Sequence, residues 1–81
     1  MYKLIENYIN KLTKEDIIKF SIKNNVVLND IEVSYLYNII KEKYKIILDG
    51  DTSIFNDIKN NINEKAYNKI IDLYSIYKNY L

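Results

Sequence analysis

The sequence predicts an all-α fold, a compact bundle of four to five short helices that forms a single domain over residues 1–81. Apolar residues recur at spacings of three and four in each long segment, which is the period of an amphipathic helix. Several of these segments follow an Asn, Ser or Thr that can act as N-cap. With 48% apolar residues and a net charge of +1, the composition is that of a globular chain.

Two helices are expected in the first part of the chain. The first covers about residues 2–12. The second begins at Lys14, after an N-cap at Thr13, and ends at Asn24–Asn25, because Asn tolerates the left-handed conformation of a helix C-terminus. Periodicity predicts that the following residues face inward: Leu4, Ile5, Tyr8, Ile9, Leu12, Ile17, Ile18, Phe20 and Ser21.

The clearest helix start lies at Asn29. Asn29 can cap the helix, and Glu32, three residues later, can return a hydrogen bond in a capping box. This central helix runs to about Lys45, and the pattern leaves open whether residues 46–48 continue it or become extended. The short apolar connection at residues 26–28 is expected to be a buried linker. The predicted apolar stripe of the helix is Val33, Leu36, Tyr37, Ile39, Ile40, Tyr44, Ile46 and Ile47.

A turn is expected at Gly50, the one glycine of the chain, which can adopt a positive φ angle without steric cost. A fourth helix then covers about residues 53–62, with Asp51 or Ser53 as the capping residue. Its predicted apolar stripe is Ile54, Phe55, Ile58 and Ile62.

The last helix has two candidate starts. Asn61 with Glu64 would form one capping box, whereas a start at Asn63 would begin the helix two residues later. In either case the helix reaches about Tyr80. Its predicted buried residues are Ala66, Tyr67, Ile70, Leu73, Tyr74 and Tyr77, with Ile76 and Tyr80 towards one edge.

No catalytic residues, cofactor site or metal site can be assigned, and we expect the protein not to be an enzyme. The chain contains no Cys and no His, so it lacks a thiolate nucleophile and the usual proton shuttle at neutral pH. Residues 49–51, Asp-Gly-Asp, resemble part of a calcium-binding loop. However, the twelfth position counted from Asp49 is Asn60, where such loops carry Glu, so a plain turn is favoured.

Nucleic-acid binding is the alternative function. The second and third helices could form a helix-turn-helix, with Lys41, Lys43 and Lys45 as candidate contacts. The charges disfavour it, because the helix that would enter the groove begins with Asp30 and Glu32. The chain also has no Arg, the residue that reads guanine edges in the major groove.

The favoured function is a protein-interaction or adaptor domain that binds a cellular or host protein, or another copy of itself. The chain has nine Tyr, more than so small a core can bury, and Tyr suits surfaces where one end of the side chain is apolar and the other wet. A small domain can also complete its core with a partner. The candidate interface residues are Tyr35, Tyr44, Ile76, Tyr77 and Tyr80.

A membrane partner is not expected. No uncharged apolar run approaches the ~18 residues that a spanning helix needs. Lys3, Glu6 and Lys11 interrupt the region that a signal peptide would require to be apolar. A cytoplasmic location is the default expectation.

Three short motifs resemble a family of short bacterial proteins, the YqfT-like domain of unknown function. They are residues 12–17 (Leu-Thr-Lys-Glu-Asp-Ile), 27–29 (Val-Leu-Asn) and 53–56 (Ser-Ile-Phe-Asn). The resemblance covers nearly the whole chain and implies a small cytoplasmic helical protein. It implies no activity and no site residues. The acidic residues at 49–51, where that family would be expected to carry basic ones, and the absence of Arg are departures from it.

Overall fold

The computed structural model describes residues 3–80, apart from the side chains of Tyr77 and Tyr80. This part of the chain is all-α, as predicted, with five α-helices and a terminal 3₁₀ turn. The elements in chain order are α1 (Lys3–Lys11), α2 (Lys14–Lys23), α3 (Asp30–Leu48), α4 (Ile54–Asn61), α5 (Glu64–Tyr77) and η1 (Lys78–Tyr80).

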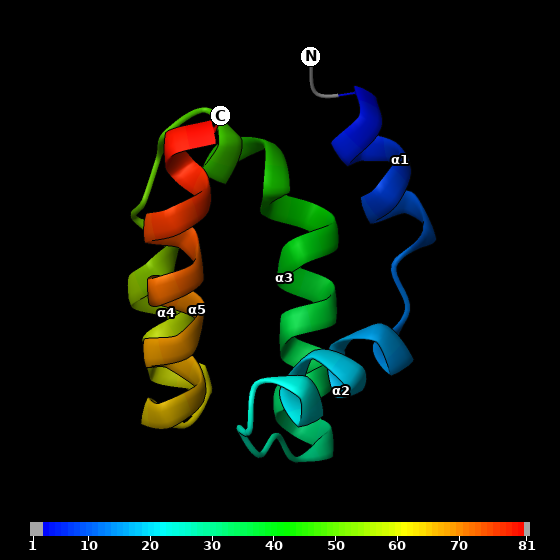
Figure 1. The fold of residues 1–81 in the computed structure, drawn as a ribbon, viewed down its shortest axis with the longest axis vertical. Coiled ribbons are helices and arrows are strands. Elements are labelled where there is room, and N and C mark those ends of the chain that lie inside the picture. Colours follow the sequence, from blue (N-terminus) through cyan, green and yellow to red (C-terminus); the bar gives the residue numbers. More distant parts are fainter. Residues whose placement is uncertain (1–2, 81) are drawn as a thin grey trace.

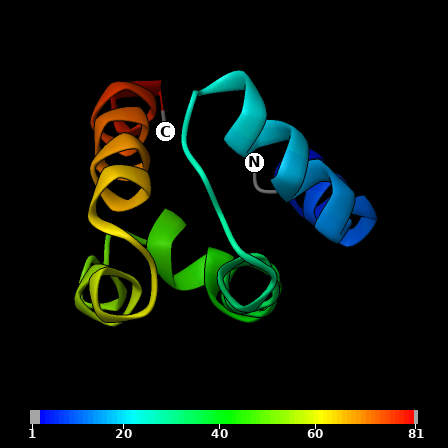
Figure 2. The same ribbon diagram turned by 90° about the horizontal axis from the view of Figure 1, so that it is seen from below.

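The long helix α3 is the centre of the arrangement. It contacts α1, α2 and α4, whereas α5 is held principally by α4. Figure 1 shows α1 and α2 on one side of α3 and the α4–α5 pair on the other. Seen from below, the α1–α2 pair and α5 lie on opposite sides, and α3 and α4 run between them along a third side (Figure 2). We call the α1–α2 pair and α5 the two walls of the bundle, and α3 and α4 its floor.

The core lies along the predicted apolar stripes. Its buried apolar residues come from α2 to α5 and from the connections between helices: Leu12, Ile17, Val26, Val33, Leu36, Phe55, Ile58, Ile62 and Ala66. Phe55 and Tyr74 join α4 to α5 by a tilted ring contact, with ring centroids 4.9 Å apart. No described helix is both long enough and apolar enough to cross a membrane.

Local hydrogen bonds confirm the predicted helix starts. At α3 the Glu32 N–H donates to Asn29 Oδ1 (2.8 Å), and the Asn29 N–H donates to Glu32 Oε1 (3.0 Å). Thr13 and Asp16 form the same reciprocal box at α2, although Asp replaces the usual Glu. Each box satisfies N–H groups that the first helical turn leaves without a partner.

The structure resolves the alternatives that the sequence left open. Residues 46–48 continue α3 as helix, and the last helix starts after Asn63. Gly50 takes the expected positive φ of 94°, and Asn25 takes a φ of 57° after α2. At α4 the side chain of Ser53 makes no capping bond, and Asp51 Oδ1 instead accepts the Ser53 N–H (2.9 Å).

Four side chains that were predicted to face inward are exposed, one of which is Ile46 on α3, at 38%. Leu4 and Tyr8 on α1 are 83% and 67% exposed, because the only principal contact of α1 is with α3 and its apolar face extends past that helix. The linker is only half buried: Val26 is inside, whereas Val27 is 81% exposed. Successive side chains in a non-helical, extended segment point to opposite sides, so burying Val26 turns Val27 outward.

Candidate functional site

An apolar groove runs between the two walls of the bundle. It encloses a cavity of about 300 Å³ that is open to solvent on one side. Every α-helix contributes to its lining, which comprises Tyr8, Leu12, Asp16, Ile17, Phe20, Leu36, Ile40, Ile47, Phe55, Ile58, Ile70 and Leu73. Eleven of these twelve side chains are apolar or aromatic, so the groove is a surface for binding apolar groups.

Helical periodicity places these residues on the groove. Leu36, Ile40 and Ile47 lie at spacings of four and seven along α3, so they fall on one face and form the floor. Ile70 and Leu73, three residues apart, form the wall on α5. Helical periodicity correctly predicted that these residues face inward. It does not predict that the neighbouring helices leave them partly uncovered.

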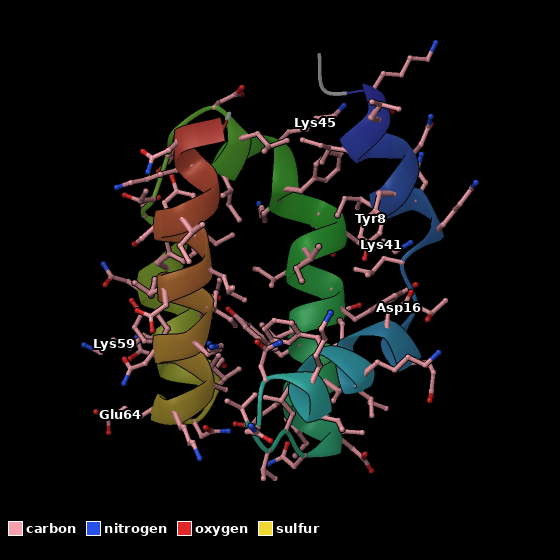
Figure 3. All side chains as sticks on the ribbon, viewed as in Figure 1. Tyr8, Asp16, Lys41, Lys45, Lys59 and Glu64 are labelled. Atoms are coloured by element: carbon pink, nitrogen blue, oxygen red, sulfur yellow. The ribbon has the colours of Figure 1, made fainter. Side chains whose placement is uncertain are left out.

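The outer part of the groove is polar. Four residues line both the apolar cavity and a second hollow next to it: Tyr8, Asp16, Phe20 and Leu73. The second hollow is also lined by Lys19 and Lys23 of α2 and by Asn24, the residue that follows this helix. Figure 3 shows Tyr8 and Asp16 on the side of α3 that carries α1 and α2. The apolar interior is therefore continuous with a charged rim.

The groove leaves the core incompletely packed. Among the described residues, no large side chain is fully buried, and the best-covered large ones, Leu36 at 3% and Ile17 and Ile58 at 4%, all line the groove. The groove is partly open to solvent and its lining is almost entirely apolar, so apolar groups of a ligand would leave water on entering it.

Comparison with known proteins adds no relative. No family model, characterised protein or solved structure matches the chain. The resemblance to the YqfT-like family thus stays a prediction, and the site has to be interpreted from its own chemistry.

Two of the candidate interface residues that the structure describes lie on different faces of α3. Tyr35 and Tyr44 are both half buried on α3 but, nine residues apart, they lie on opposite faces of the helix. Ile76 on α5 is 55% exposed. The side chains of Tyr77 and Tyr80 lie outside the described part, so their role in an interface stays a prediction.

Tyr35 has a structural role that the sequence did not indicate. Its hydroxyl donates a hydrogen bond to Asp57 Oδ2, which ties α3 to α4. Burial of the ring and this bond to a carboxylate both disfavour the phenolate, so the pKa of Tyr35 is raised well above its ordinary value of 10.0. The hydroxyl of Tyr35 therefore already has a partner within the bundle, and a role of Tyr35 in an interface stays a prediction.

This shift predicts a loss of stability at high pH. Above about pH 10 an unfolded chain releases the Tyr35 proton while the folded chain keeps it, so rising pH favours unfolding. We expect the free-energy difference between the wild type and Tyr35→Phe, measured by urea unfolding, to shrink from pH 8 to pH 10.5. A difference that stays constant over that range would contradict the assignment.

Two of the three candidate nucleic-acid contacts share a face of α3. Lys41 and Lys45 are one helical turn apart, whereas Lys43, two residues from each, lies on the opposite side of the helix. The Lys41 ammonium donates to the Asn10 carbonyl (3.1 Å) and lies 5.3 Å from the ring centroid of Tyr37, so it holds α1 against α3. Lys43 lines a shallow hollow together with Asp51 and Asp57. Lys45 is exposed beside Tyr44, 6.0 Å from its ring centroid. The three lysines therefore do not lie on one face of α3.

The acidic residues also have local structural roles. Asp16 and Asp51 accept hydrogen bonds from backbone N–H groups at helix starts, and these bonds lower the pKa of both carboxyl groups. In the described part of the chain, no three acidic side chains converge as ligands for a metal ion would. The Asp49–Asp51 segment forms a turn followed by a capping residue.

Proposed function

We propose that the protein is a non-enzymatic interaction domain whose groove binds an amphipathic helix of another protein. The observation that carries the proposal is the open apolar cavity at the centre of the bundle, lined by side chains from all five α-helices. Helix-in-groove recognition uses such a surface, because apolar residues at positions i, i+3 or i+4, and i+7 of the bound helix insert together.

The cavity has a suitable size for this mode. A dry cavity of about 150 Å³ accommodates one benzene ring, so a groove of twice that volume has room for two or three apolar side chains. Binding would cover the exposed side of Tyr8 and Leu73 and complete the packing of the core. A partner that binds the folded state alone would also raise the thermal stability of the domain.

A display library of helical peptides tests the proposal. We expect selection on the folded protein to enrich peptides with a helical stripe of large apolar residues. Leu73→Asn, which places an amide on the groove wall, should weaken their binding about tenfold or more, because an unpaired polar group is buried on binding. The matched control is Ile22→Asn on α2, where the side chain is 70% exposed and outside the groove lining.

Two results would contradict the proposal. One is a selection that enriches no helical apolar stripe. The other is a selected peptide that binds Leu73→Asn and Ile22→Asn equally well while circular dichroism shows both variants to be folded.

A further inference from the structure

The rim of the groove on α2 is basic. Lys19 and Lys23 are one helical turn apart, both are exposed, and both line the polar hollow that is continuous with the apolar cavity. The acidic residue on this rim is Asp16, whose Oδ2 accepts hydrogen bonds from the Thr13 N–H (2.9 Å) and Oγ1 (3.1 Å). These bonds hold the Asp16 carboxylate at the start of α2 and lower its pKa, and the positive charge of Lys19 lowers that pKa further.

The wall on α5 contributes Leu73 to this polar hollow and no charged side chain. The charged residues that line the hollow are two lysines, Lys19 and Lys23, and one acid, Asp16. The rim of the groove at the hollow therefore carries a net positive charge.

A second copy of the chain is a poor occupant of this rim. The most exposed amphipathic helix of the chain, α1, offers Leu4 and Tyr8 as apolar anchors, but it also carries Lys3 and Lys11 against a single Glu6. Placing it in the groove of another copy would bring like charges together. Like-charge juxtaposition across an interface selects against a partner.

We propose that the helix bound in this groove is acidic, with an apolar stripe that fills the cavity and Asp or Glu residues at its edges that can face Lys19 and Lys23. This inference rests on the proposed function and specifies the chemistry of the partner. Charges at an interface rim mainly set partner choice and the rate of association, so the acidic edges would provide specificity while the apolar stripe provides most of the affinity.

Three synthetic peptides test the inference. They share one helical apolar stripe and differ in the flanking positions, which are all Glu, all Gln or all Lys. Binding of the fluorescently labelled peptides to the whole protein is followed by anisotropy at 50 mM and 500 mM NaCl. At the lower salt concentration we expect the Glu peptide to bind about tenfold more tightly than the Lys peptide. The gap should narrow at the higher concentration, because exposed charges are screened.

Charge-reversal variants locate the effect. Lys19→Glu with Lys23→Glu should reverse the order of the Glu and Lys peptides. The matched control, Lys43→Glu with Lys59→Glu, makes the same change in net charge at exposed positions outside the groove and should keep the order. Lys59 lies on α4, on the far side of the molecule from Asp16 (Figure 3).

The outcomes separate the two proposals. Equal binding of all three peptides, or tighter binding of the Lys peptide, would overturn the acidic-helix inference and leave the helix-binding function standing. No binding of any peptide would overturn both. Both would also fail if the peptides did not bind but a single-stranded oligonucleotide did, and the Lys19→Glu, Lys23→Glu variant abolished that binding.

Discussion

Replacing Leu36 by Ala is expected to lower the free energy of unfolding by about 3 kcal/mol, within the range typical of buried Leu. Leu36 is 3% exposed at the centre of α3, where it is part of the core and forms part of the groove floor. A chain of this length has a total stability of about 4–12 kcal/mol, so the loss would be a large fraction of the total. Urea unfolding followed by circular dichroism measures it.

The control for this prediction lies on the same helix. Ile31 is 79% exposed, and Ile31→Ala should change the free energy of unfolding by no more than about 0.5 kcal/mol. Equal effects of the two substitutions would show that α3 does not form the centre of the core.

Asn63→Ala is expected to lower the free energy of unfolding by about 2 kcal/mol, at the upper end of the range for an N-cap. Asn63 Oδ1 accepts the Ala66 N–H (2.9 Å), and its Nδ2 donates to the Val27 carbonyl (2.6 Å) and to Glu32 Oε2 (3.2 Å). The substitution therefore removes the cap of α5, one bond to Glu32 in the first turn of α3 and one bond to the linker that precedes α3. Thermal and urea unfolding would both report the loss.

Two further variants isolate this effect. Asn60→Ala, an exposed position on α4, should stay within about 0.5 kcal/mol of the wild type. A double-mutant cycle of Glu32→Ala and Asn63→Ala should give a coupling energy of about 1 kcal/mol, since the two side chains are bonded directly. Additive losses in that cycle would mean that the bond between the Asn63 and Glu32 side chains does not contribute to stability.

Glu32 connects the starts of two helices. One carboxylate oxygen closes the capping box of α3, and the other accepts the backbone N–H of Asn63 (2.6 Å). A single side chain thus links the starts of α3 and α5. Because α5 forms one wall of the groove and α3 part of its floor, these bonds connect the wall to the floor.

Features that depend on neighbours within four residues could be predicted from the amino-acid sequence. The caps at Thr13 and Asn29, the positive φ of Gly50 and the apolar faces of α3 and α4 follow from local hydrogen bonding and from the helical period. Both partners of such an interaction lie within one helical turn of each other, so the interaction forms regardless of where the helix lies in the fold.

Which apolar side chains are covered by another helix follows from the tertiary structure alone. Periodicity gives the direction of Tyr8 and Leu73 but not the space in front of them, so predicted core residues became groove residues. The choice of Asn63 over Asn61 as cap depends on Glu32 and Val27, 31 and 36 residues away. Lys41 likewise meets Asn10 across 31 residues. Burial and hydrogen bonding between distant segments depend on how the helices are placed in space. A local sequence pattern does not contain this information.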